Sequence, residues 1–523
     1  MVAASELSIN TNVTAAEMAN SMFGSGVTIV NATYTGATSA SGIYYGGSTT
    51  TPGVAPLDTG VILSTGRATD FTNSSGTANQ SASTTTSQGT AGDAQLTAIA
   101  GFQTYDAAIL TSTFIPDGNV LTMQVTFSSE EYLEYVGSGF NDAVAIWVNG
   151  TQAQLTVGTG DITINNINTT SNSNLFVNNP SATSPYNTEM DGFTVTLTLK
   201  APVIAGAENT IKIAIADAGD RSYDSNLMIA GDSIQVALIA GDDSIELPMF
   251  GTGTLNVLVN DSSVVGGTLT ITQINGVDVV AGDAVTLPTG EVVTLNVDGT
   301  FDITADAGVG VNTFTYTVED VDGNSDVAFV TVDTVPCFTR GTLILTQRGE
   351  IAIEKLTLGD KVITRDHGLQ PVRWIGNRPV PKSGACAPVI IAAGTFGNHD
   401  ELVVSPQHRI LIRTTQAQLI MATEEVLVKA LHLVNGTSVR RDTSGGMVDY
   451  FHILFDMHEV IWSNGLETES FHPGANVLGD MDVEARQEIL DLFPELDPVT
   501  GQGYGPAARP DIKSHEARAL FAT

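Results

Sequence analysis

The chain has 523 residues, with 57 acidic against 21 basic side chains and a formal net charge of −36 at pH 7. This charge argues against nucleic acid as a partner, because affinity for phosphates rests on Lys and Arg. Two cysteines cannot form a disulfide framework for so long a chain, so we expect both to be thiols. The length predicts three domains, and the 52 glycines with 15% charged residues predict a mainly β protein.

Residues 1–24 contain no basic stretch followed by an apolar run, so any export uses a route without an N-terminal signal peptide. No stretch reaches the roughly 18 apolar residues of a membrane span, and we expect no transmembrane segment. Thr14 and Glu17 form a capping-box pattern, which predicts a short helix running to Phe23. Strands of a two-sheet sandwich are predicted at residues 27–30, 60–64, 120–127, 143–148, 193–199, 210–215 and 233–238. Residues 69–92, rich in Ser, Thr and Gly, are predicted to be a long solvated loop.

Acidic residues of this first region cluster where strands end, in residues 127–142 and 217–226. A calcium ion needs six to eight oxygen ligands, and the two segments can supply several if they meet in space. The candidate ligands are Glu130, Glu131, Asp142, Asp217, Asp220 and Asp224. The alternative interpretation is that these residues form turns and solvated strand edges.

The Ser-Glu-Glu-Tyr run that ends at Tyr132 and the Phe-Asn-Asp run that ends at Asp142 resemble the bacterial choice-of-anchor L domain. We assign residues 8–240 to such a domain, and the resemblance implies a secreted or surface location. Residues 241–335 then alternate strand patterns with Asp-Gly turns and are similar to the cadherin-like repeats of exported bacterial proteins. This β-sandwich is expected to be a spacer, with Asn260, Asp261, Glu319, Asp320 and Asp322 as candidates for calcium between its strands.

Three blocks in the last third of the chain resemble, in order, the Hint domain shared by hedgehog autoprocessing domains and inteins. They are residues 337–342 with 353–363, residues 405–409, and residues 450–461 followed by Ser463 to Gly465. The resemblance implies an all-β, horseshoe-like domain at residues 336–474 that cleaves its own chain. Residues 475–523 are expected to be an appendage with two short helices, at residues 480–493 and 512–521.

Cys337 follows Pro336 directly, so its thiol can attack the preceding carbonyl and convert the Pro336–Cys337 peptide bond into a thioester by an N-to-S acyl shift. A thiol of pKa about 8.5 needs a base or a favourable charge nearby. His408 is the candidate general acid toward the Cys337 nitrogen, because imidazole exchanges protons near pH 7. Ser405 stands where the family usually has Thr in a Thr-x-x-His motif, and its hydroxyl is the candidate oxyanion-type donor.

Asp456 and His458, two residues apart on a predicted strand, are expected to share one face and to support the reaction. His452 lies on the same predicted face and is interpreted as a core histidine. Cys386 has no motif around it and is expected to be a passive thiol. No Cys or His pair has the spacing of a zinc site, so autoprocessing is expected to need no cofactor.

Two departures from the family change the expected outcome. Inteins end with His-Asn before a nucleophile, whereas the corresponding place here is Glu469-Ser470, so splicing is not expected. Residues 371–378 lack the acid that assists sterol transfer in hedgehog domains, so hydrolysis or transfer to another nucleophile, such as a cell-surface acceptor, is favoured. The substrate is then the protein's own polypeptide. The alternative is a non-catalytic, calcium-dependent adhesin or matrix protein with a relic Hint fold, and a glycan hydrolase acting through Glu130 and Glu131 is the least favoured hypothesis.

Overall fold

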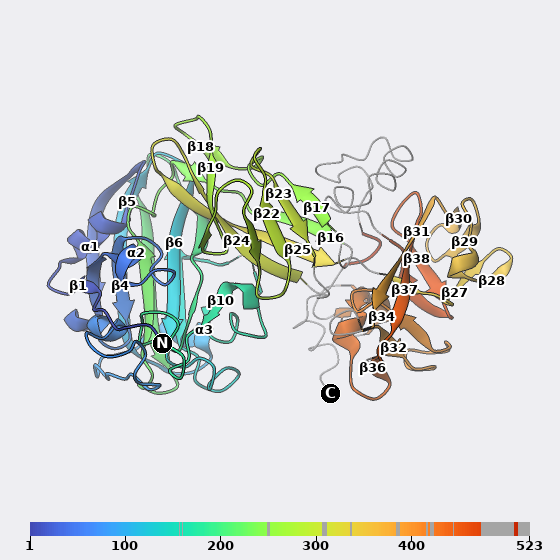
Figure 1. Cartoon of the computed structure of the whole chain (residues 1–523), viewed down its shortest axis with the longest axis horizontal. Helices are drawn as coiled ribbons and strands as arrows, with labels where there is room; N and C mark the ends of the chain where they lie inside the picture. The colour runs from blue at the N-terminus through green and yellow to red at the C-terminus, as the bar shows by residue number, and fades with distance from the viewer. Residues whose placement is uncertain are drawn as a thin grey trace.

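The structure is a computed structural model of the whole chain, and it describes residues 1–155, 157–158, 160–247, 252–305, 311–334, 337–382, 387–414, 417–418, 423–442, 444–471 and 507–510. The described residues form a mainly β protein, as predicted. Apolar side chains gather in separate clusters in the first, second and last parts of the chain. Figure 1 shows these three parts following one another along the long axis of the molecule.

The first region is a sandwich of two sheets. One sheet has the order β1-β3-β4-β14-β6-β11-β10, with β12 also on β6, and the other has the order β2-β5-β13-β7-β8, with β9 also on β7. The strands of the first sheet are β1 (Ser8–Asn10), β3 (Ser41–Tyr45), β4 (Thr59–Ser64), β6 (Val120–Ser129), β10 (Phe176–Asn178), β11 (Gly192–Thr194), β12 (Leu197–Pro202) and β14 (Ser225–Ala230). Those of the second are β2 (Val27–Thr35), β5 (Thr104–Pro116), β7 (Ala143–Val148), β8 (Thr151–Ala153), β9 (Ile162–Thr163) and β13 (Asn209–Ala218).

Three α-helices of the described residues belong to this region: α1 (Ala15–Met22), α2 (Gly47–Thr50) and α3 (Ala94–Ala100). Helix α1 confirms the predicted capping box, because the Thr14 hydroxyl accepts from the Glu17 amide and the Glu17 carboxylate accepts from the Thr14 amide.

Three predictions for this region were wrong. The strand predicted at residues 193–199 is divided between β11 and β12, and residues 233–238 form only bridges and turns before β15 (Leu238–Ile239). The loop at residues 69–92 is held against the body by buried acceptors: the Thr84 and Thr86 amides donate to Glu130 and Asp224. A composition rich in Ser and Thr therefore marked a docked segment instead of a solvated loop.

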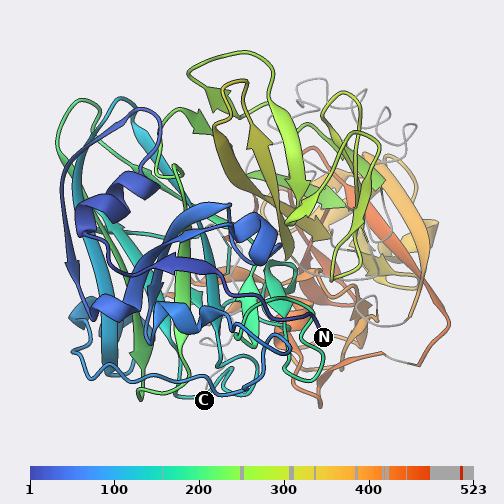
Figure 2. The same cartoon turned by 60° about the vertical axis from the view of Figure 1, so that its left-hand side comes forward.

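The second region contains two further sheets, in the orders β16-β25-β24-β19-β20 and β17-β23-β22-β21. Their strands are β16 (Asp243–Leu247), β17 (Thr252–Leu255), β19 (Thr270–Ile274), β20 (Val277–Asp278), β21 (Ala284–Thr286), β22 (Val292–Leu295), β23 (Phe301–Thr304), β24 (Val311–Glu319) and β25 (Ser325–Thr334), and β15 pairs with β18 (Ser262–Ser263). Figures 1 and 2 both show β25 beside the first region. There the hydroxyl of Thr122 donates to buried Asp326 at 2.6 Å, and the Gln124 amide donates to the Ser325 carbonyl at 2.8 Å.

The acidic candidates of the second region have structural partners. Tyr316 donates its hydroxyl to Asp261, and the Asp320 carboxylate accepts from the Asp322 and Asn324 amides in the turn between β24 and β25. The Asp320 contact is an Asx turn, which needs no ion.

The third region contains one sheet in the order β31-β37-β26-β33-β32-β36 and another in the order β28-β27-β29-β38-β39-β34-β35, with β30 on β29. The first comprises β26 (Phe338–Thr339), β31 (Trp374–Pro381), β32 (Val389–Ile391), β33 (Leu402–Val404), β36 (Val439–Arg441) and β37 (Met447–Leu454). The second comprises β27 (Leu343–Thr346), β28 (Gly349–Ala352), β29 (Lys361–Thr364), β30 (Gly368–Pro371), β34 (Arg409–Arg413), β35 (Glu425–Lys429), β38 (Val460–Ser463) and β39 (Leu466–Glu469). The helices predicted at residues 480–493 and 512–521 lie outside the described residues.

Candidate active site

Cys337 is positioned by the central strand of a sheet. Strand β26 lies between β33 and β37, and its first residue, Phe338, pairs with Val404 on one side and Phe451 on the other. In antiparallel pairing, the residue before Phe338 faces the residue after each of its partners. Cys337 therefore lies opposite Ser405 and His452. The sheet therefore brings together three polar residues from three separate parts of the sequence.

The contacts of Cys337 involve both its backbone and its thiol. Its amide donates to the Ser405 Oγ at 2.8 Å, and the Ser405 amide donates to the Cys337 carbonyl at 2.9 Å. Its Sγ lies 3.4 Å from the Nε2 of His452. Cys337 is a free thiol, 4% exposed. The thiol thus has a base beside it, and the nitrogen of the bond before it has a hydroxyl beside it.

His408 lies buried against the strand that carries the thiol. Its ring is 4.2 Å from the ring of Phe338, and neither ring nitrogen has a hydrogen-bond partner among the described residues. Burial lowers the pKa of His408 to about 4, and the positive charge of Arg409 acts in the same direction. His408 is therefore neutral at pH 7 and, once protonated, a strong acid.

His458 belongs to a second buried group, together with Arg409 and Glu469. The Glu469 carboxylate lies 3.1 Å from a guanidinium nitrogen of Arg409 and 3.4 Å from the Nε2 of His458. Although burial favours the neutral acid, the charge of Arg409 outweighs it and lowers the pKa of Glu469 to about 2. The Nδ1 of His458 accepts from the amide of Ala508 at 3.1 Å, so Nε2 is the nitrogen that can donate to Glu469.

The predicted arrangement of Asp456 with His458 was wrong. Strand β37 ends at Leu454, and Asp456 lies in the turn before β38, where it is exposed and makes a two-pronged salt bridge with Arg373. The chain turns between Asp456 and His458, so the period of two that would give them one face does not apply. Pro336 and Cys386 lie outside the described residues.

Sequence reasoning missed two components of this site. His452 was interpreted as a core histidine, although it lies directly opposite Cys337. Glu469 was considered only as part of the Glu469-Ser470 pair that stands in place of the intein His-Asn. The pairing of Phe338 with Phe451 could have revealed His452, had the register been known. No motif indicated the pairing of Glu469 with Arg409, because the two residues are 60 positions apart.

The two acidic segments of the first region meet, as the calcium hypothesis requires. The Ala218 amide donates to Asp142 Oδ1 at 2.9 Å, and the Glu130 amide donates to the Asp224 carbonyl at 3.2 Å. Five of the six candidates are buried, which rules out a solvated edge for them: Glu130, Glu131, Asp142, Asp217 and Asp224. Asp220 is half-buried and accepts from the Ser222 amide, as an Asx turn does.

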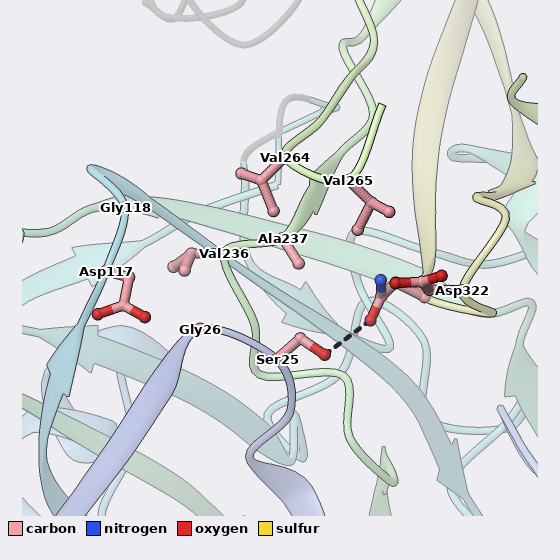
Figure 3. A pocket seen from close by; sticks show the side chains of 10 residues that line it. Ser25, Gly26, Asp117, Gly118, Val236, Ala237, Val264, Val265 and Asp322 are labelled. Carbon is pink, nitrogen blue, oxygen red and sulfur yellow. Dashed lines mark hydrogen bonds between the residues drawn. The ribbon is translucent and has the colours of Figure 1, made fainter. Parts of the chain in front are cut away.

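A pocket of about 680 Å³ lies at the seam between the first two regions, away from Cys337. Figure 3 shows it lined by apolar groups such as Val236 and Val264 and bordered by Asp117 and Asp322, with Ser25 donating to Asn324 across its floor at 2.8 Å. Its lining residues include no histidine, cysteine or basic side chain. The lining therefore offers no imidazole base and no nucleophilic thiol.

Three family models match successive parts of the chain. Residues 7–235 match the choice-of-anchor L domain, residues 235–333 match the bacterial Ig domain, and residues 336–475 match the Hint domain. A search of curated proteins finds no match. Within the described residues, no helix has the length and apolarity needed to cross a membrane.

Solved structures give weaker likenesses. The crystal structure of the gp41-1 intein is 13% identical and covers 25% of this chain and 97% of its own, with a TM-score of 0.17; a variant of that intein gives the same identity and TM-score. The M60 catalytic domain with two CBM51 domains from Clostridium perfringens ZmpB is 10% identical and covers 71% of this chain and 35% of its own, with a TM-score of 0.14. The family matches show what the chain carries in order: a choice-of-anchor L region, a bacterial Ig region and a C-terminal Hint region that contains Cys337.

Proposed function

We propose that the Hint region cleaves the peptide bond between Pro336 and Cys337 and thereby releases the two N-terminal β regions from the C-terminal part of the chain. The observation that carries this proposal is the double contact of Cys337, with its thiol at His452 and its amide at Ser405. A nucleophile beside a base, with a polar group at the bond that must break, is the arrangement that nucleophilic catalysis requires.

The first step is an N-to-S acyl shift. His452 takes the proton of the Cys337 thiol, and the sulfur attacks the carbonyl carbon of Pro336, forming a C–S bond. The C–N bond then breaks, and the amide nitrogen leaves as the free amine of Cys337 after it gains a proton. We assign the delivery of this proton to His408, which is neutral at pH 7 and first takes up the proton that His452 removed from the thiol; its low pKa then makes the protonated imidazole a strong donor.

The role of Ser405 differs from the oxyanion role that the family comparison suggested. Its hydroxyl accepts from the scissile nitrogen, so it acts on the nitrogen side of the bond. This contact holds the nitrogen lone pair in a fixed orientation while the carbonyl carbon becomes tetrahedral. A fixed geometry of this kind lowers the entropy cost of the attack.

The second step consumes the thioester. Water, or another nucleophile such as a cell-surface acceptor, attacks the thioester carbonyl; the C–S bond breaks, and Cys337 regains its thiol. Splicing is not part of the proposal, since Glu469-Ser470 stands at the place of the intein His-Asn pair and Glu469 is a buried, ion-paired carboxylate. The match to the choice-of-anchor L domain supports a secreted or surface location for the released part.

Trapping the thioester tests this proposal. Hydroxylamine added to the purified chain should release residues 1–336 with a hydroxamate at the C-terminus, and the Cys337→Ala variant should yield none. The Asp456→Asn variant serves as a matched control, because Asp456 is exposed and paired with Arg373 away from the thiol. Release of the same fragment from Cys337→Ala would exclude Cys337 as the nucleophile.

A further inference from the structure

The buried acids of the first region lie where both sheets end. Glu131 follows β6 and Asp224 precedes β14 in one sheet, while Asp142 precedes β7 and Asp217 lies in β13 of the other. Hydrogen bonds from one segment to the other, such as Ala218 to Asp142, close this end of the sandwich. Carboxylates from four strands are thereby enclosed between the two sheets.

Three of these acids lack a basic partner. No Lys, Arg or His of the described residues forms an ion pair with Glu131, Asp142 or Asp217; the neighbouring pair is Arg221 with Asp106. Burial raises the pKa of Glu131 to about 8 and those of Asp142 and Asp217 well above the ordinary value. Buried carboxyl groups in such a setting need protons or a cation to offset the loss of water.

The outer acids of the cluster, Glu130, Asp224 and Asp106, already accept hydrogen bonds from another segment of the chain. The amides of Thr84, Thr86 and Gln88, at every second residue of an extended segment, donate to Glu130, Asp224 and Asp106 at 3.0, 2.9 and 3.0 Å. This segment covers one side of the cluster. Together with the Thr90 amide, which donates to Asp106 Oδ1, the segment occupies both oxygens of Asp106 and one oxygen each of Glu130 and Asp224. Among the described contacts it donates no hydrogen bond to Glu131, Asp142 or Asp217.

Asp142 and Asp217 each keep one carboxylate oxygen without a donor in the described part of the chain, whereas Glu131 accepts from the Asp142 amide. Asp142 Oδ2 and Asp217 Oδ1 have no hydrogen-bond partner among the described residues, and both side chains are 2% exposed or less. The hydroxyl of Ser225 lies against the Asp142 carboxylate, and the buried amide oxygen of Asn226 has no hydrogen-bond partner among the described residues. Buried oxygens that lack enough donors are the environment that a hard cation occupies.

We propose that Glu131, Asp142 and Asp217, with the hydroxyl of Ser225, bind a calcium ion at the closed end of the first region. Calcium takes oxygen ligands at 2.3–2.6 Å in a flexible geometry, and the remaining positions are filled by Asn226 or water. No three acidic, histidine or cysteine side chains of the described residues already converge at metal-ligand spacing. Binding therefore requires the free oxygens to move closer together around the ion. This proposal is independent of cleavage at Cys337.

Calorimetric titration tests the site directly. Calcium chloride is titrated into the full chain, carrying Cys337→Ala so that it stays in one piece, after removal of metals with EDTA. We expect one binding event, weakened at least about tenfold in Asp142→Asn and in Asp217→Asn because each loses a charged ligand. Glu208→Gln, which changes an exposed acid of the same region, should bind calcium as the parent does.

The unfolding temperatures of the same proteins, measured in EDTA and in calcium, show whether a variant that binds no calcium is still folded. In EDTA, Asp142→Asn should unfold at the same or a higher temperature than the parent, because it removes one buried repelling charge; with calcium, the parent should be the more stable of the two. Absence of calcium binding by the folded parent would overturn the proposal. So would a variant more stable than the parent under both conditions, since protons alone would then neutralise the cluster.

Discussion

The amide of Cys337 donates to the Oγ of Ser405 at 2.8 Å, and the amide of Ser405 donates back to the carbonyl of Cys337 at 2.9 Å. This reciprocal pair of hydrogen bonds fixes the position of the scissile nitrogen. One of the two bonds uses the Ser405 hydroxyl, which a substitution can remove. Ser405→Ala should slow the release of residues 1–336 about tenfold, the rate equivalent of one lost hydrogen bond. Ser405→Thr, which keeps the hydroxyl, should cleave at close to the parent rate. Equal rates for Ser405→Ala and the parent would exclude the hydroxyl from the reaction.

His452 is expected to be the base for the thiol, because its Nε2 lies 3.4 Å from the Cys337 Sγ. His452→Ala should lower the cleavage rate about 10²- to 10⁴-fold, the usual contribution of a positioned proton acceptor. His367→Gln is the control, since His367 is about half exposed and pairs with Glu459. The assignment fails if His452→Ala cleaves as fast as His367→Gln when followed by gel densitometry.

Burial of His408 makes the stability of the Hint region depend on pH. The folded pKa of about 4 lies below the unfolded value of 6.5, so the unfolded chain binds more protons between these limits. Stability is therefore fully present above pH 6.5 and is lost as the pH falls toward 4, by about 3 kcal/mol.

Urea unfolding of Cys337→Ala at several pH values, with and without His408→Phe, measures this effect. The difference between the two proteins should change between pH 6.5 and 4, with the histidine protein losing more stability. A constant difference across this range would contradict the neutral, buried state of His408.

The Glu469 carboxylate should be worth far more to stability than the Asp456 carboxylate. Glu469→Gln removes the fully buried carboxylate that pairs with the partly buried Arg409 and should cost about 3–5 kcal/mol. Asp456→Asn breaks an exposed pair with Arg373 and should cost no more than about 1 kcal/mol. Denaturant unfolding in the Cys337→Ala background compares the two. Similar losses of unfolding free energy in the two variants would mean that the Glu469 ion pair stabilises the Hint region no more than an exposed salt bridge does.

Much of this architecture followed from the sequence, because local chemistry specifies it. The capping box at Thr14 and Glu17 specified α1, and the β character of all three regions followed from alternating apolar residues and Gly or Asp turns. The strand at residues 143–148 was predicted with its observed ends, whereas β5, a strand of thirteen residues in the middle of its sheet, was not predicted.

The missed features depend on pairing between distant segments. His452 meets Cys337 through the register of β26 with β37, and Glu469 meets Arg409 through the pairing of β39 with β34. The segment at residues 84–90 read as a loop because its own side chains are small and polar; the carboxylates that hold it come from β5, β6 and the start of β14. The composition of a segment indicates how much apolar surface it can bury. It does not indicate which hydrogen-bond acceptors from other parts of the chain lie beside it in the fold.

The most direct test of autoprocessing is the intact mass of the purified chain over time, beside Cys337→Ala, with and without dithiothreitol. The account predicts fragments of residues 1–336 and 337–523 from the parent alone, formed faster with the added thiol, and any added mass on the first fragment identifies the acceptor. A parent chain that stays whole even with dithiothreitol, while its Hint region is folded, would contradict cleavage at Cys337 and favour a non-catalytic adhesin or matrix protein.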